Sequence, residues 1–486
     1  MSYRYARDPQ TDESLHRSVR DGVAWSVMFG AGESYLAALA VFLRASTAQI
    51  SLLAALPSLL GAVAQLAGAW VAGCVGQRKP LIRAGVLLQT LMWVPIMALA
   101  FVPSEHAVTL LIACISLYYI GGQFAAPPWC SLISDLVPER RRGRFFARRT
   151  RYMSMATFIS LVAAGLALEF FEQRALARWG FALVFAVALG GRLYSLTQLM
   201  RMHEPPRQLA PLALPPLAGL LPRVLGTDFA RFAWFVAAMN LAVAIASPFF
   251  TLYMLRDLQF SYLQFTAVSA FYVLVQVAAL KVWGRLADVY GNRLIMHVTS
   301  IVFPLMPILW VLLPTFWFIL SIQIVSGACW AGFSLAAGNY LYDIAPPEKR
   351  AAYSAIHQAL SNGAIFWGAL LGGFLGSHVP AVFELGGTTL HFTSGLWAVL
   401  IVSGLARALA AVVFLPRLRE VRQVRKVSAT ALALRVTRAT VVAGWLFELL
   451  PSRQRVASWQ AMAKMTRPRF GALSESHETG SLDKVA

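Results

Sequence analysis

The sequence contains little charge. Only 13% of its 486 residues are Asp, Glu, Lys or Arg, whereas ordinary soluble proteins carry about 25%. Hydrophobic residues make up 58% of the chain, and the mean hydropathy is +0.62. A soluble chain of this length would form about three domains, but apolar runs long enough to cross a bilayer fill most of the sequence. The composition therefore excludes a soluble multidomain protein and predicts a polytopic α-helical membrane protein.

Acidic residues are scarcer than basic ones. The chain has 22 Asp and Glu against 42 Lys and Arg, a net charge of +20. In a soluble protein this excess would indicate nucleic-acid binding. Here the basic residues lie between the apolar runs, where such residues set membrane topology. We therefore expect membrane lipids around the protein and no nucleic-acid partner.

Cysteine and known catalytic motifs are also sparse. All four cysteines lie inside apolar stretches, with neither metal-ligand spacing nor a disulfide framework; they are Cys74, Cys114, Cys130 and Cys329. The chain has no H-E-x-x-H, P-loop, G-x-S-x-G or Asp-rich metal motif. We expect no metal, no cofactor and no enzymatic activity.

Twelve apolar segments are long enough to span a membrane as helices. Those of the first half are 22–43, 47–72, 82–102, 107–134, 152–170 and 180–200. Those of the second half are 229–254, 262–283, 294–313, 315–342, 355–376 and 395–415. The predicted domains are a segment 1–21, a six-helix bundle 22–200, a proline-rich loop 201–228, a second bundle 229–415 and a basic tail 416–486.

Lysine and arginine are distributed unequally between the two sides of these spans. The termini and even-numbered connections hold 36 of them, and the odd-numbered connections hold four. Because cytoplasmic segments are enriched in Lys and Arg, both termini and the loop 201–228 are predicted to be cytoplasmic. This bias and the lack of disulfides suit a bacterial inner (plasma) membrane.

The two halves repeat a motif. Asp135, Pro138 and Arg142 follow the fourth span, and Asp343, Pro346 and Arg350 follow the tenth with the same spacing. After the eighth span the chain reads Gly284-Arg285-Leu286-Ala287-Asp288-Val289-Tyr290-Gly291-Asn292-Arg293. This resembles the G-x-x-x-D-x-x-G-[RN]-[RK] loop of the major facilitator superfamily, and the resemblance covers about residues 20–416. It implies twelve helices in two pseudo-symmetric six-helix bundles, with a substrate site between them.

The first half departs from this pattern. In its copy of the loop, Gly73 stands where the acidic residue would be, while Arg78 and Lys79 keep the basic pair. This argues against a full charge network beneath the first half. The fifth span also lacks the G-P-x-x-G-G pattern of the family's drug/proton antiporters, which disfavours drug efflux.

Glu33 is the acidic residue at the centre of the first predicted span. A carboxylate there is costly unless it is paired, protonated or facing water. One interpretation is a structural hydrogen-bonded group, and the other is a proton- or substrate-coupling site, since burial moves a carboxylate pKa toward the working range. Other polar and aromatic residues fall on the spans that line the cavity in the resembled fold, with core hydrogen bonding as the alternative to substrate contact. They are Tyr35, Tyr118, Tyr119, Gln123, Asn240, Gln276, Gln358 and Asn362.

The resemblance also implies a cytoplasmic gate made of charge pairs, with Asp288 facing Arg293, Asp135 facing Arg142 and Asp343 facing Arg350. Gly284 and Gly291 permit the tight turn beside them. The function predicted from all this is secondary active transport of a small solute by alternating access, coupled to protons. An integral-membrane lipid-modifying enzyme and a non-transporting receptor or scaffold remain as alternatives.

Overall fold

The computed structural model describes residues 5–6, 8–75, 77–102, 106–138, 142–205, 227–345, 350–380, 382–385, 388–391 and 394–420. Twelve helices in this part of the chain are long and apolar enough to cross a membrane. The predicted all-α membrane architecture of six plus six spans is therefore confirmed. The predicted loop 201–228 and tail 416–486 lie mostly outside the described residues.

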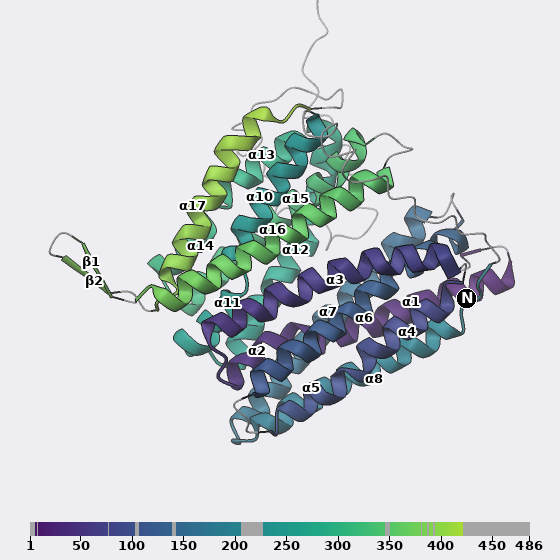
Figure 1. Ribbon diagram of the computed structural model, residues 1–486, viewed down its shortest axis with the longest axis horizontal. Coiled ribbons are helices and arrows are strands. Elements are labelled where there is room, and N and C mark those ends of the chain that lie inside the picture. The colour runs from purple at the N-terminus through teal and green to yellow at the C-terminus, as the bar shows by residue number, and fades with distance from the viewer. Residues whose placement is uncertain are drawn as a thin grey trace, which may run out of the picture. The chain divides into compact units, whose positions relative to one another are not determined.

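The first six spans are built from eight helices and one 3₁₀ turn (Figure 1). In chain order they are α1 (Pro9–Ala31), η1 (Glu33–Tyr35), α2 (Leu36–Phe42), α3 (Thr47–Val75), α4 (Lys79–Leu91), α5 (Trp93–Leu99), α6 (Ala107–Leu136), α7 (Arg142–Glu172) and α8 (Ala177–Met200). The first span joins α1, η1 and α2, and the third joins α4 and α5.

The last six spans are interrupted at other places. Their elements are α10 (Asp228–Ala246), α11 (Phe249–Leu252), the π-helical turn η3 (Tyr253–Asp257), α12 (Tyr262–Tyr290), α13 (Asn292–Val302), α14 (Leu305–Leu312), α15 (Phe316–Ile344), α16 (Arg350–His378), α17 (Trp397–Phe414) and the 3₁₀ turn η5 (Leu415–Arg417). The contact pattern repeats in the two halves, because α1 packs on α7 and α8 as α10 packs on α16 and α17. Likewise α6 packs on α3 and α4 as α15 packs on α12 and α13.

Three helices begin earlier than their apolar runs. Helix α1 begins at Pro9, α7 at Arg142 and α16 at Arg350, whereas apolarity alone predicted spans from 22, 152 and 355. For α1 the reason is local. Asp8 accepts hydrogen bonds from the side chain and backbone of Thr11, so it caps the helix, and these bonds lower the pKa of the Asp8 carboxyl. Proline suits the first turn that follows.

A short antiparallel hairpin departs from the all-helical prediction. Strands β1 (Val382–Leu385) and β2 (Thr388–His391) pair between α16 and α17, with Val382 opposite His391. We call the end of the helices that carries this hairpin the hairpin end. The opposite end, which carries the start of α1 and the turn between α3 and α4, is called the basic end (Figure 1).

Several hydrogen bonds join the two halves at the hairpin end. The Tyr35 hydroxyl lies 2.8 Å from Thr266 Oγ1, and the Ser51 hydroxyl donates to the carbonyl of Ala369 at 2.7 Å. Near them the backbone N–H of Leu263 donates to Glu169 Oε2 at 3.0 Å. The hydrophobic core beside these bonds draws buried residues from both halves. The hairpin end is therefore closed by contacts of η1, α3 and α7 with α12 and α16.

Candidate functional site

Glu33 lies at a break in the first span. Helix α1 ends at Ala31, and Glu33 begins the single 3₁₀ turn before α2. Two neighbouring tyrosines of α6 hold its carboxylate: the Tyr118 hydroxyl donates to Oε2 at 2.7 Å, and the Tyr119 hydroxyl donates to Oε1 at 2.9 Å. Each carboxylate oxygen thus has its own hydroxyl donor. Glu33 is 24 residues from the start of α1 and nine from the end of α2, so it is closer to the hairpin end than the predicted central position.

Aromatic side chains pack around Glu33 at this break. Trp93 is fully buried and contacts Tyr118 edge-on, with ring centroids 5.1 Å apart. A Cβ atom on Gly32 would come within 2.5 Å of the Trp93 ring and 2.6 Å of Ala188 Cβ. Only glycine therefore fits beside Glu33 at this approach of α1 to α5 and α8. The Trp93 indole N–H is buried and has no hydrogen-bond partner among the described residues.

A buried arginine of α8 connects Glu33 to a second acidic residue. Arg192 is 5% exposed and interacts electrostatically with both Glu33 and Asp21. Its Nη1 donates to the Ser195 hydroxyl at 2.8 Å, which in turn donates to Asp21 Oδ1 at 2.6 Å. Arg149 of α7 lies 3.6 Å from Asp21 Oδ2. These four ionisable groups, on α1, η1, α7 and α8, have no net charge when both carboxylates are ionised.

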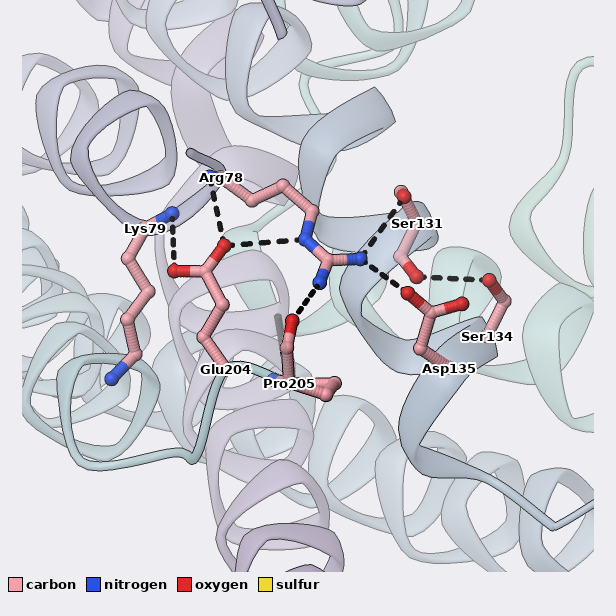
Figure 2. Close-up of polar contacts among 7 residues, drawn as sticks. All are labelled: Arg78, Lys79, Ser131, Ser134, Asp135, Glu204 and Pro205. Atoms are coloured by element: carbon pink, nitrogen blue, oxygen red, sulfur yellow. Dashed lines mark hydrogen bonds and ion pairs between the residues drawn. The ribbon is translucent and has the colours of Figure 1, made fainter. Parts of the chain in front are cut away.

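Arg78 is the centre of a second polar cluster, at the basic end (Figure 2). Its side chain is 1% exposed. Nη1 contacts Asp135 Oδ2 at 2.6 Å, Nε contacts Glu204 Oε1 at 3.2 Å, and Nη2 donates to the carbonyl of Pro205 at 3.0 Å. The backbone N–H of Arg78 also donates to Glu204, at 2.9 Å. One buried guanidinium therefore ties together the start of α4, the end of α6 and the segment after α8.

This cluster corrects the expectation that the first half lacks a full charge network. The acidic residue missing at Gly73 is replaced by Glu204, which is 126 residues from Arg78 in the chain. Asp135 was predicted to face Arg142, and its described ion pair is with Arg78. The side chain of Arg142 lies outside the described part of the structure.

The corresponding region of the second half is built differently. Gly291 has a φ of 86°, so the turn between α12 and α13 does require glycine. The Asn292 amide donates to Asp343 Oδ2 at 2.8 Å, and the Arg293 backbone N–H donates to Glu420 at 2.9 Å. Asp288 is exposed on α12, near Gly284. The Arg350 side chain lies outside the described residues, so the pairing of Asp343 with it, like that of Asp288 with Arg293, stays a prediction.

The remaining candidates fall into two groups by exposure. Tyr35 and Tyr118 are fully buried with their hydroxyls bonded, Tyr35 to the carbonyl of Leu161 as well as to Thr266. The others are half-buried or exposed; they are Tyr119, Gln123, Asn240, Gln276, Gln358 and Asn362. Substrate contact stays a prediction for this second group. Tyr35 instead takes part in the closure between the halves.

Sequence reasoning missed Asp21, Arg149, Glu204 and Trp93 as parts of these clusters. Asp21 and Arg149 were placed outside the spans because their own surroundings are polar. The spacing gave no signal for Asp21 either, since 12 residues are about 3.3 helical turns and do not place it on the same helix face as Glu33. No local pattern could indicate Glu204, because it is 126 residues from Arg78 in the chain and meets it only in the folded protein.

The fold defines a membrane protein of twelve spans in two similarly packed halves. The sequence model of the Major Facilitator Superfamily matches residues 23–244 and 232–466. The chain therefore belongs to the Major Facilitator Superfamily. A curated relative, an MFS-type transporter of Aspergillus terreus (strain NIH 2624 / FGSC A1156), is 22% identical over 118 residues, which are 24% of this chain and 21% of that protein. This match spans about a fifth of the relative's length.

Solved structures share the fold over most of the chain. A bacterial homologue of the human lysosomal transporter Spinster, inward-facing and occupied, aligns with a TM-score of 0.65 at 16% identity, covering 85% of this chain and 98% of that one. The nucleoside transporter NupG aligns with a TM-score of 0.62 at 14% identity, covering 84% and 99%. An inward-facing bacterial homologue of the iron transporter ferroportin gives 0.63 at 12% identity, covering 83% and 98%. At these identities the likeness is one of fold.

Proposed function

We propose that the protein is a secondary active transporter that moves a small solute by alternating access and couples this movement to protons through Glu33. Membership of the Major Facilitator Superfamily supports transport. The repeated packing of two six-span halves supports rocking of one half against the other. The observation that carries the coupling is the carboxylate of Glu33, held at a helix break by two tyrosine hydroxyls.

The contacts between the halves support an inward-facing state. Tyr35, Ser51 and Glu169 of the first half bond to the second half at the hairpin end. With the basic end cytoplasmic, these contacts close the route to the outside. Opening that route requires breaking them, and an outward-facing state then requires new contacts at the basic end, where the predicted gate residues Asp288 and Asp343 lie.

Glu33 is placed to respond to such a change. It belongs to the same 3₁₀ turn as Tyr35, which bonds across to the second half. Protonation of Glu33 removes the negative charge that Tyr118, Tyr119 and Arg192 stabilise. The tyrosine contacts would then weaken from charge-assisted to neutral hydrogen bonds. A proton on Glu33 can thereby shift the orientation of η1, and with it the balance between the two states.

The orientation predicts where inserted reporters will lie. A topology reporter placed at residue 215 or after the C-terminus should report cytoplasm, because these positions belong to the basic side of the 36-to-4 distribution. A reporter in the turn at Ala175, between α7 and α8, should report the opposite side. Finding residue 215 and Ala175 on one side would contradict the arrangement.

The closure at the hairpin end predicts coupled effects of Tyr35→Phe and Thr266→Val. Each removes the buried hydrogen bond of 2.8 Å between them. Tyr35→Phe leaves the Thr266 hydroxyl without this partner and should weaken closure by about 1–3 kcal/mol, whereas Thr266→Val should weaken it less, because Tyr35 keeps its bond to the Leu161 carbonyl. Spin labels at Ala48→Cys and Leu263→Cys, in a chain without its native cysteines, should report a larger population of long distances.

Because the two residues share one hydrogen bond, the double variant should weaken closure no more than the single variant with the larger effect. Tyr262→Phe is the matched control, since the Tyr262 ring packs on Phe181 at the same interface, with centroids 5.7 Å apart. Strictly additive effects of Tyr35→Phe and Thr266→Val would contradict the shared bond.

The proposed function is tested in two steps. Comparing the metabolites of cells with and without the protein identifies candidate solutes. The purified chain in liposomes should then move such a solute, and an imposed pH gradient should drive it uphill. Solute flux without pH dependence would contradict proton coupling and still support transport. Turnover of a lipid without solute flux would favour the enzyme alternative.

A further inference from the structure

A groove on the outer side of the first half lies at the basic end, beside the Arg78 cluster. Its volume is about 440 Å³, and it is lined by α4 and the last residue of α8: Lys79, Pro80, Arg83, Ala84, Leu87 and Met200. Two of these residues are cations, and the others present apolar surface. The groove therefore offers one charged end and one apolar end to a ligand.

The sequence of α4 orders these features along one helix face. Lys79, Arg83, Leu87 and Leu91 are spaced four residues apart, so they form a single stripe along α4. Arg83 is exposed, Leu87 is 39% exposed and Leu91 is 51% exposed. The stripe thus begins with two positive charges at the end of the span and continues with leucines toward its middle.

We propose that this groove binds an anionic phospholipid, with its phosphate between Lys79 and Arg83 and an acyl chain along Leu87 and Leu91. Two cations one helical turn apart match a phosphate and a negatively charged or polyhydroxyl headgroup. The leucines match the chain that the same molecule extends into the bilayer. A free phosphate or a soluble anion would use the cations and leave the leucines uncovered, so the combination selects a lipid.

The site adjoins the Arg78 cluster through the backbone. The Lys79 N–H lies 3.4 Å from Glu204 Oε2, and Glu204 is bound to Arg78. Neither Lys79 nor Arg83 has an acidic side chain among the groove-lining residues. A bound lipid would neutralise these two cations and hold α4 against the end of α8, which is where the Arg78 cluster also holds them.

The test uses the purified full chain and native mass spectrometry with added phosphatidylglycerol or phosphatidylcholine. The wild type should retain one phosphatidylglycerol at concentrations where phosphatidylcholine is released. Lys79→Gln with Arg83→Gln should lower this retention by about tenfold or more, since each basic residue near an anionic membrane surface contributes about fivefold. Arg83 is exposed and Lys79 is half-buried at the start of α4, so we expect the variant to fold.

The matched control is Lys281→Gln with Arg285→Gln, which removes a Lys–Arg pair of the same spacing from α12, where both residues are exposed. This control should keep the retained phosphatidylglycerol. Equal loss in both double variants would show general charge attraction and overturn the site, as would equal retention of the two lipids by the wild type.

Two further measurements keep the proposal testable if Lys79→Gln with Arg83→Gln proves unstable. Leu87→Gln should weaken the binding of long-chain phosphatidylglycerol while leaving both cations in place. Competition by glycerol 3-phosphate at the same concentration as the lipid would instead identify a site for soluble phosphate and overturn the lipid assignment. Neither measurement depends on transport, so both remain valid if the proposed function is wrong.

Discussion

Replacing Arg78 by methionine should destabilise the first half more than the loss of any exposed basic residue. The guanidinium is 1% exposed, and it is the described cationic partner of both Asp135 and Glu204. Arg78→Met removes the guanidinium that both carboxylates contact. Removing one partner of a buried ion pair typically costs about 3–5 kcal/mol, because the remaining charge is uncompensated.

The apparent unfolding midpoint of the detergent-solubilised protein measures this effect. Arg83→Met is the matched control, because Arg83 lies one turn further along α4 and is exposed; exposed positions of this kind usually change stability by less than about 0.5 kcal/mol. The unfolding midpoint of Arg78→Lys should lie between those of Arg78→Met and Arg83→Met. Lysine keeps the positive charge but lacks the planar guanidinium that contacts Asp135, Glu204 and Pro205 together.

A triple variant separates charge from packing. In Arg78→Met with Asp135→Asn and Glu204→Gln, no unpaired charge remains, so much of the lost stability should return. If the triple variant is as unstable as Arg78→Met alone, the cluster acts through its shape and hydrogen bonds instead. An unchanged midpoint in Arg78→Met would show that the ion pairs do not stabilise the fold.

The helices could be predicted from the sequence because the signal is local. Each span is one apolar run, and all twelve runs coincide with helices of the structure. The helix limits that polar residues set were missed, as were the 3₁₀ turn at Glu33 and the hairpin between α16 and α17. Helix α1 starts at Pro9 because Asp8 caps it, and α7 starts among the arginines around Arg142, where hydropathy gives no signal.

Side-chain partners could not be predicted, because they depend on packing between distant segments. The sequence motif suggested that Asp135 pairs with Arg142, seven residues away, whereas its described ion pair is with Arg78, 57 residues away. Tyr118 and Tyr119 were expected to line a cavity, and the structure shows them bound to Glu33, 85 and 86 residues away. The sequence singled out Glu33, Tyr118 and Tyr119 separately, and the fold brings the three together.

The helix break at Gly32 could be predicted in part from the local sequence and depends in part on packing between distant segments. Gly30 and Gly32 beside Glu33 permit the close approach of a helix or a substrate, and at Gly30 the structure shows the approach of α7, since a Cβ atom there would come within 2.5 Å of the Thr157 carbonyl. The sequence did not predict that the helix itself changes to a 3₁₀ turn at Glu33. That turn places Glu33 toward α6 and Tyr35 toward α12 within three residues.

Replacing Glu33 by glutamine should abolish uphill transport while preserving the fold. The amide has the size of the carboxylate, and its oxygen accepts a hydrogen bond from one tyrosine while its NH₂ group donates to the other hydroxyl. It cannot bind or release a proton in the working pH range. If one proton is coupled to each solute, a gradient of one pH unit supports up to about tenfold accumulation in the wild type, since one unit corresponds to about 1.36 kcal/mol. The variant should reach a ratio of about one.

Three measurements in liposomes distinguish coupling from packing. Solute exchange between equal concentrations should persist in Glu33→Gln, because exchange needs no net proton movement. Glu172→Gln, which removes an exposed carboxylate at the end of α7, should accumulate solute normally. Tyr119→Phe removes one donor but keeps a titratable Glu33, so its transport should stay pH-driven with a displaced pH profile. If Glu33→Gln still accumulates solute with the wild-type pH dependence, Glu33 serves only to bind Tyr118 and Tyr119, and protons couple to transport elsewhere.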